Sequence, residues 1–538
     1  MRRGQTFQKV GGLRPRRSAF DLSYAKLFNC DMGQLVPVFC DEVVPGDYFN
    51  ISNEIVIRMQ PLVAPVLHEV YATTHFFFVP YRLLWDEWET FITGGRDGNY
   101  VGEPPLLNTI DGLQSFNSEL RYSLIDYLGF PIPAPGNDIV ISNDASPVKF
   151  PVNAYNFVYN EYYRDQNFSE PIDLDNIEIL NRAWTKDYFT SALPWIQRGA
   201  IPALPVNTAI DGEFITNITT NTATTIQPNG SLVFNGGTVN ASGDTTTRNL
   251  QVVGSTSSTG GNQSYVSGLR ATSTSTSQAD SEAELVAVST SLNVADLRVA
   301  FQISKWQERN ARSGVRYTEF LRAHYGVAPT DERLDRPEYI GGTKSPIIIS
   351  EVLQTSSTDT TSPQGNLAGH GITADKTRVG SYHVKEFGLI IGIFSVLPKP
   401  SYIPQGVARQ WTRRNRYDYF APEFIHLSEE PVLNREIYMQ GTAEDQGVFG
   451  YQGRYDEMRV KQDMVCGSMQ DVYSYWHLSR RFESLPMLGQ EFVECEPEET
   501  KRIYAVQDEP GLIVHYGNKI RAVRPLPVLA EPGLIDHF

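Results

Sequence analysis

The sequence contains only four cysteines in 538 residues and no Cys-x-x-Cys motif. This number is too small for a disulfide framework in a chain of this length, so we expect reduced, mostly buried thiols. The longest apolar run, Gly388–Leu397, has ten residues and is too short to cross a bilayer. The basic N-terminus also lacks the apolar stretch of a secretory signal. We therefore predict a protein without a disulfide scaffold and without membrane insertion.

Recognisable catalytic motifs are also missing. Gly342–Ser345 resembles the end of a phosphate-binding loop, but a threonine replaces the glycine required before the lysine. His68 and Glu69 begin like a zinc-protease helix, but Ala72 stands where the second histidine is needed. We therefore expect no enzyme activity, no cofactor and no metal site.

Positive charge is scarce except at the N-terminus. The chain has 46 basic and 62 acidic residues and a net charge of −16. The first twenty residues contain no acid and six cations, so the remainder carries −22. An acidic body of this kind is not a general polyanion binder, but its basic arm is a candidate nucleic-acid contact, with a frayed, solvated terminus as the alternative. The six candidates are Arg2, Arg3, Lys9, Arg14, Arg16 and Arg17.

The composition, with 41% hydrophobic and 20% charged residues, excludes a wholly disordered chain. A single core stops growing near about 250–300 residues, so we expect several units or one large β domain with long insertions. Strands are predicted at both ends of the chain, so the middle should be inserted between them. The strand candidates are Leu35–Phe39, the alternating segment Phe49–Met59, Val66–Pro80, Tyr382–Val396, Leu512–Tyr516 and Ile520–Val528.

Two helices and one polar segment are predicted within that middle region. Asn293 is a candidate cap for a helix that runs to about Arg312, and a second helix should span Tyr317–Tyr325 and close at Gly326. Residues 216–290 contain 28 serines and threonines and few apolar side chains. They fit either a disordered linker or a small exposed β module, and we favour the module.

A second basic cluster is interleaved with aromatic side chains, among them Tyr417 and Tyr419. Arginine binds phosphate, and aromatic faces stack on bases, so the cluster is a candidate DNA contact. Arginine and aromatic residues also dominate interface hot spots, and we favour this second role, an intersubunit or interdomain anchor. The candidate residues are Arg409, Trp411, Arg413, Arg414 and Arg416.

Several segments, taken in order, resemble the major capsid protein of the microviruses, which are small icosahedral single-stranded DNA phages, and especially its gokushovirus branch. The resemblance runs from about residue 18 to the C-terminus, with a gap at the Ser/Thr-rich segment. The resembling segments are Leu35–Phe49 (LVPVFCDEVVPGDYF), Phe76–Trp88 (FFFVPYRLLWDEW), Tyr155–Asn167 (YNFVYNEYYRDQN), Lys186–Gln197 (KDYFTSALPWIQ), Leu297–Glu319, Arg336–Gly342 (RPEYIGG), Pro363–Leu367 (PQGNL), Arg416–Tyr438, Val448–Arg459 (VFGYQGRYDEMR) and Pro532–Phe538 (PGLIDHF).

The resemblance implies a mainly β fold, an eight-stranded antiparallel viral jelly roll with long insertion loops and a few helices. Residues 1–34 would form a basic, interior-facing arm, residues 35–210 and 292–538 the capsid body, and residues 211–291 a surface insertion that projects at the threefold axes. About sixty copies would assemble in the host cytoplasm into a T=1 icosahedral shell, the virion capsid.

The resemblance also implies several partners. The shell would enclose single-stranded DNA and associate with a small basic DNA-binding viral protein and with the scaffolding and pilot proteins of the virus. Its surface insertion would contact a host receptor. Two other readings of the residues stay open, a β-sandwich polysaccharide-binding protein and a host adhesin.

Overall fold

The fold is described from a computed structural model of the chain. The structure describes residues 16–200, 294–313, 316–353 and 367–529, together with short strand segments between residues 207 and 291. The chain divides into two compact units, residues 1–198 with 308–538, and residues 199–307.

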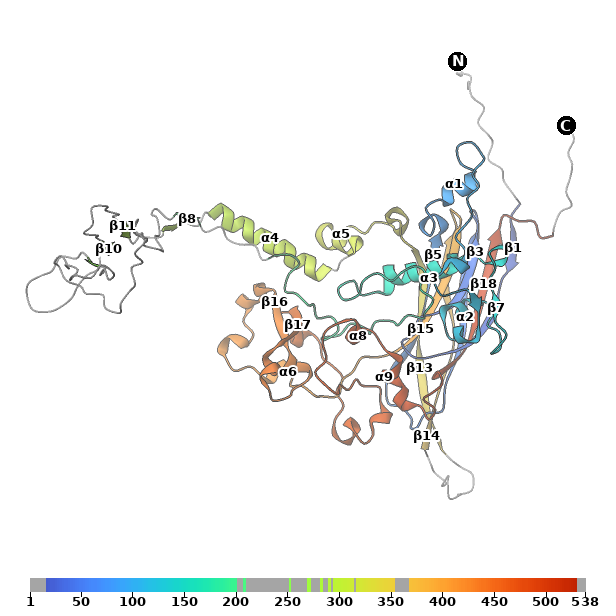
Figure 1. Cartoon of the computed structure of the whole chain (residues 1–538). Helices are drawn as coiled ribbons and strands as arrows, with labels where there is room; N and C mark the ends of the chain where they lie inside the picture. The colour runs from blue at the N-terminus through green and yellow to red at the C-terminus, as the bar shows by residue number, and fades with distance from the viewer. Residues whose placement is uncertain are drawn as a thin grey trace, which may run out of the picture. The chain divides into compact units, whose positions relative to one another are not determined.

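Nine antiparallel strands form one sheet in the larger unit (Figure 1). They are β1 (Ser18–Asp21), β2 (Tyr24–Cys30), β3 (Val36–Val43), β4 (Tyr48–Met59), β5 (Val70–Pro80), β13 (Glu338–Leu353), β14 (Leu367–His383), β15 (Gly388–Pro398) and β18 (Leu512–Arg524). The order across the sheet is β1-β18-β4-β14-β13-β5-β15-β3, and β2 also pairs with β18.

The sheet consists of two halves that face each other. One half contains β2, β18, β4 and β14, and the other contains β13, β5, β15 and β3. Along the chain, these eight strands alternate between the halves, except that β5 is followed by β13 in the same half, and β1 adds to the first half by pairing with β18. Pairing of β13 with β14 joins the halves into one curled sheet. This connectivity is that of an eight-stranded jelly roll, so the predicted fold class is confirmed.

The core lies between the two halves. In β4, the odd-numbered side chains Phe49, Ile51, Ile55, Ile57 and Met59 are buried, as their alternation predicts. They pack against inward side chains of β18, β5 and β15. Each large apolar side chain buried in this way contributes about 1.5–3 kcal/mol to the stability of the fold.

Strand β5 is buried on both of its faces. Phe76 and Phe78 point into the core, whereas Phe77 and Val79 contact a layer of inserted residues outside it. Tyr155 belongs to that layer, and its hydroxyl donates a hydrogen bond to the Leu35 carbonyl oxygen at 2.8 Å. The outer faces of β5 and β15 are therefore covered, which explains why these two strands are apolar with little alternation.

Two long insertions interrupt the jelly roll. Residues 81–337 connect β5 to β13, and residues 399–511 connect β15 to β18. The first insertion contains β6 (Ser115–Phe116), β7 (Ile139–Val140), α1 (Trp88–Thr93), α2 (Leu124–Leu128), α3 (Phe150–Val158), α4 (Val294–Ser313) and α5 (Tyr317–Tyr325). The second contains β16 (Glu429–Leu433), β17 (Val448–Gly453), α6 (Asn434–Ile437), α7 (Asp456–Arg459), α8 (Gln490–Val493) and α9 (Pro497–Thr500). Helices α4 and α5 confirm both helix predictions, and Gly326 closes α5 in the left-handed conformation.

The smaller unit contains short strands within the Ser/Thr-rich region. Strands β9, β10 and β11 form a three-stranded sheet, and β8 pairs with β12. Their bounds are β8 (Asn207–Ala209), β9 (Gln251–Val252), β10 (Leu269–Ala271), β11 (Ser281–Ala283) and β12 (Ser289–Ser291). Most of residues 211–291 lies outside the described residues, so its assignment as a surface insertion stays a prediction.

Three predicted boundaries are wrong. Residues 18–30 were expected in the N-terminal arm, but they form β1 and β2 and pair with β18, because β18 would otherwise expose an unpaired edge. The expected strand Tyr382–Val396 is interrupted by a turn between β14 and β15. The two strands expected at 512–516 and 520–528 are one continuous strand, since Gly517 and Asn518 continue the ladder with β4.

A half-buried histidine links β5 to the first insertion and gives a pH prediction. Burial, and then the charge of Arg182, lower the pKa of His75 to about 4, and its Nδ1 lies 2.8 Å from the Tyr163 hydroxyl. In the unfolded chain the His75 side chain is protonated near its ordinary pKa of about 6.5, whereas in the folded state it stays neutral down to about pH 4. Stability should fall as the pH drops from about 6.5 to 4, by on the order of 3 kcal/mol at most.

The substitution His75→Gln tests this prediction, because glutamine offers a hydrogen-bonding side chain but does not titrate. We expect melting temperatures measured from pH 7 to pH 4 to fall less steeply for the variant than for the unsubstituted protein. Equal slopes for the two proteins would contradict a role for His75 in acid sensitivity.

Candidate assembly surface

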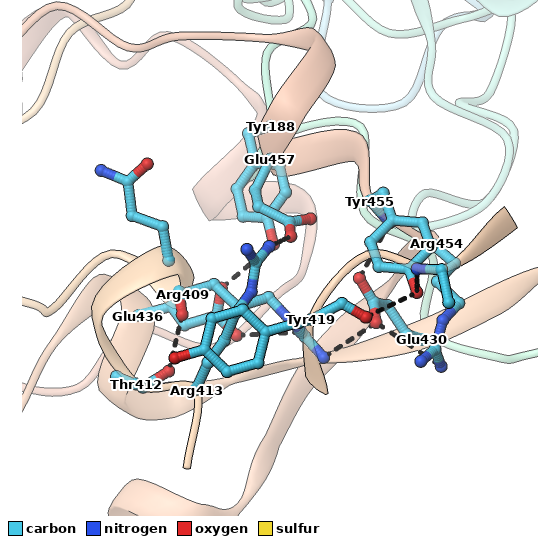
Figure 2. Close-up of polar contacts among 12 residues, drawn as sticks. Tyr188, Arg409, Thr412, Arg413, Tyr419, Glu430, Glu436, Arg454, Tyr455 and Glu457 are labelled. Carbon is cyan, nitrogen blue, oxygen red and sulfur yellow. Dashed lines mark hydrogen bonds and ion pairs between the residues drawn. The ribbon is translucent and has the colours of Figure 1, made fainter. Parts of the chain in front are cut away.

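The predicted Arg/aromatic cluster lies in the second insertion, and its arginines divide into two groups. Arg409 belongs to the group that is partly buried and held by carboxylates (Figure 2). Its guanidinium donates hydrogen bonds to Glu430 Oε2 at 3.0 Å, to Glu436 Oε1 at 3.2 Å and to the Pro431 carbonyl oxygen at 2.6 Å. The two carboxylates come from β16 and α6, so one arginine ties these elements to the chain that follows β15.

Burial dominates the electrostatics of this group. Loss of solvation raises the pKa of both Glu430 and Glu436, and the charge of Arg409 offsets part of the increase. Burial alone would lower the pKa of Arg409, but the two carboxylates raise it. Tyr188 adds a hydrogen bond from its hydroxyl to Glu436 Oε2 at 3.0 Å. The three charges therefore depend on one another for compensation.

Arg413 makes a second internal ion pair. Its guanidinium bonds to Glu457, and both side chains are almost buried. It also lies 5.9 Å from the centre of the Tyr419 ring. Arg409 and Arg413 therefore act within this chain as anchors of the insertion, which leaves little of either guanidinium for DNA.

The other members of the cluster are exposed. The Trp411 side chain is 76% exposed, and Arg414 and Arg416 are also exposed. The Arg416 guanidinium donates to the neighbouring Tyr417 hydroxyl at 2.6 Å and stacks on its ring. The buried arginines therefore fix the segment that presents these side chains to solvent.

Exposed apolar side chains are concentrated in the same part of the chain. Eleven large ones lie between residues 411 and 464, and we call them the 411–464 surface. They are Trp411, Tyr417, Tyr419, Phe420, Ile425, Leu427, Met439, Val448, Met458, Val460 and Met464. A cavity of about 180 Å³ opens beside them, with Met464 and Val460 in its wall. Exposed apolar side chains of this kind are candidates for contact with another protein.

The N-terminal candidates are placed only in part. Arg2, Arg3, Lys9 and Arg14 lie outside the described residues. Arg16 and Arg17 are exposed and immediately precede β1. Burial raises the pKa of Asp47, an effect partly offset by the Val44 N–H group and by the charges of Arg524 and Arg17. Because β1 pairs with β18, the basic arm joins the sheet at the edge formed by these two strands.

Sequence reasoning missed the buried carboxylates that organise the cluster. Glu430, Glu436 and Glu457 are 21 to 44 residues from their arginine partners. A signal was present, because Glu430 directly precedes Pro431-Val432-Leu433, an apolar segment in which charge is expected to be paired, and Glu436 follows three residues after it. Their pairing with Arg409 required the fold.

The remaining chemistry of the described residues is limited. No group of three or more His, Cys, Asp or Glu side chains in the described ranges is placed to hold a metal ion. Within those ranges there is also no helix with the length and apolar character needed to cross a membrane. All four cysteines are free, and burial raises the pKa of Cys40 to about 12, so its thiol stays protonated.

Comparison with known proteins agrees with this picture. The family described as "Capsid protein (F protein)" matches residues 8–534. Capsid protein VP1 of Chlamydia phage 1 is 34% identical, covering 98% of this chain and 97% of the relative. Capsid protein VP1 of Bdellovibrio phage phiMH2K is 31% identical over 99% and 98%, and that of Spiroplasma virus 4 is 26% identical over 96% and 95%. The chain therefore belongs to the phage capsid protein (F protein) family and is a structural major capsid protein of a small phage, located in the virion.

Proposed function

We propose that about sixty copies of this chain assemble into a T=1 icosahedral shell that encloses single-stranded DNA. The 411–464 surface is the main observation in favour of specific contacts between copies, because a monomer gains nothing from so many exposed apolar side chains. In a closed symmetric shell each contact recurs around every axis, and every chain makes several contacts at once. Contacts that are individually modest are then sufficient to hold the shell closed.

Electron microscopy of the purified protein tests the shell. The chain should be expressed alone and together with its neighbouring viral genes. We expect closed icosahedral particles of one size in at least the second preparation. Knobs on the threefold axes that disappear when residues 211–291 are replaced by a short linker would place that segment as the surface insertion. Monomers or small oligomers in both preparations would contradict the T=1 shell.

The surface insertion and the viral partners extend this proposal. Residues 211–291 are rich in serine and threonine, a composition that suits a segment that projects and meets a host receptor. Expression of the chain together with its neighbouring viral genes supplies the scaffolding and pilot proteins and the small basic DNA-binding protein. Comparing particle yield as each gene is omitted identifies which of them this chain requires.

The basic arm is proposed to face the interior and bind DNA. Six cations within residues 2–17 neutralise phosphates without recognising sequence. Deleting residues 2–17 should leave shells intact and reduce their DNA content, measured as nucleotides per particle. The deletion spares β1, which begins at Ser18, so the sheet should still form. Normal DNA loading of the truncated shells would contradict this role.

A further inference from the structure

The outer face of the second sheet half is solvent-exposed and basic. Every second side chain of β4, β14 and β18 points away from the core. Unlike the covered strands β5 and β15, these three strands expose polar side chains on their outer face. Five of them are cationic and exposed, and we call them the basic sheet face. They are Arg58 on β4, Lys376 and Arg378 on β14, and Lys519 and Arg521 on β18.

The charge of this face is opposite to that of the chain. Only two carboxylates, Asp21 and Glu54, share the described part of the face with these five cations, whereas acids outnumber bases in the whole sequence. Lys519 lies 3.8 Å from Glu54, and among the described residues the other four cations have no carboxylate within ion-pair distance. Four positive charges are therefore left to an outside partner.

The strand register places these cations in a regular pattern. Ser52 on β4 pairs with Arg378 on β14 at one side and with Lys519 on β18 at the other. These three side chains form one row across the three strands. The next row contains Ser381, Asn50 and Arg521. Strands are about 4.8 Å apart and alternate side chains about 6.7 Å apart. Cations therefore flank a central strip of small polar side chains about 10 Å across.

We propose that the basic sheet face binds the sugar–phosphate backbone of single-stranded DNA. The inference rests on the proposed DNA-filled shell and extends its DNA contact beyond the arm. Cations on β14 and β18 neutralise phosphates, while Asn50 and Ser52 between them offer hydrogen-bond donors. Among the described outward side chains of β4, β14 and β18 there is one tyrosine, the 40% exposed Tyr48, and no phenylalanine or tryptophan, so recognition follows the backbone and not base identity.

Continuity with the basic arm favours DNA over a second protein copy. Strand β1 follows directly after Arg16 and Arg17 and pairs with β18 along Ser18–Asp21. The arm therefore leaves the sheet at the edge of the basic sheet face, and Arg521 lies opposite Asp21 in the same pairing. A single strand of DNA that contacts the arm can therefore continue onto the positively charged basic sheet face.

The test combines three neutralising substitutions, Lys376→Gln, Arg378→Gln and Arg521→Gln, in the full chain, each at a cation without a described carboxylate partner. A matched control carries Arg96→Gln, Arg121→Gln and Arg333→Gln, which remove the same charge from exposed positions in the first insertion. Two quantities are measured for each protein. The first is the number of nucleotides in assembled particles, and the second is the salt dependence of subunit binding to a thymidine oligodeoxynucleotide.

We expect shells from both triple variants, but less DNA in those of the sheet-face variant. Each lost phosphate contact should reduce the slope of log affinity against log salt by about 0.7, so three should reduce it by about 2. An unchanged slope and DNA content relative to the control would overturn the inference while leaving the shell proposal intact. Loss of shells with an unchanged slope would show that the face contacts another copy, which also overturns it. Failure of the unsubstituted protein to form shells would count against the proposed function itself.

Discussion

Replacing Arg409 with methionine should destabilise the second insertion by about 3–5 kcal/mol, because two buried carboxylates lose their shared cation. The Glu430 and Glu436 side chains are only 9% and 3% exposed, so water cannot replace the guanidinium. We expect the insertion to open locally before the jelly roll unfolds, since the small core that it shares with residues 188–192 of the first insertion is separate from the main one. Limited proteolysis between residues 399 and 464, together with the melting temperature, measures the effect.

The pH dependence of this variant has a definite sign. Without Arg409, the folded-state pKa of both glutamates rises further above the unfolded value. The folded state then binds more protons than the unfolded chain between the two values, so stability increases as the pH falls. The difference between Arg409→Met and the unsubstituted protein should therefore be largest near neutral pH and shrink toward pH 4.5.

Two further variants separate charge from packing. Adding Glu430→Gln and Glu436→Gln to Arg409→Met removes the uncompensated charges and should restore most of the lost stability. Arg416→Gln removes an exposed arginine seven residues away and should change stability by less than about 0.5 kcal/mol. Equal losses in Arg409→Met and Arg416→Gln would contradict the buried anchor.

Local patterns predicted part of this fold. The alternation in β4, the helical spacing of α4 and α5 and the glycine that closes α5 depend on neighbouring residues, so they could be predicted directly. The expected cap of α4, Asn293, lies outside the described residues. Strands β13 and β14 could not be predicted from their neighbouring residues. Their sequences are rich in Gly, Thr and Ser, and they hold their places by pairing with β5 and β4, strands more than 250 residues away in the chain.

The same reasoning applies to the sites. The Arg409–Arg416 segment was recognised as an anchor or DNA contact from its composition, but its division into buried and exposed arginines depends on Glu430, Glu436 and Glu457. The basic sheet face was not recognised at all. Its residues come from three segments that are far apart, and each contributes only one or two cations. Only the strand register brings them to one surface.

Introducing charge into the 411–464 surface should abolish shell formation while leaving the subunit folded. Trp411 and Met464 are 76% and 74% exposed, so Trp411→Asp with Met464→Asp removes no core packing. A buried tryptophan at an interface is typically worth 2 kcal/mol or more, and an unpaired interfacial aspartate adds a desolvation penalty. Because each chain repeats its contacts around the symmetry axes, these losses multiply over the shell.

We expect the yield of closed particles to fall by at least about tenfold, with a melting temperature of the free subunit within a few degrees of the original. Val101→Asp is the control, since Val101 is 90% exposed in a loop of the first insertion and lies outside the 411–464 surface. Particle counts by electron microscopy and subunit size by gel filtration give the two readouts. If the double variant assembled as well as Val101→Asp, this surface would not be a contact between copies. Its apolar side chains would then have to serve a partner other than the shell itself, and the contacts that close the shell would have to be sought elsewhere on the chain.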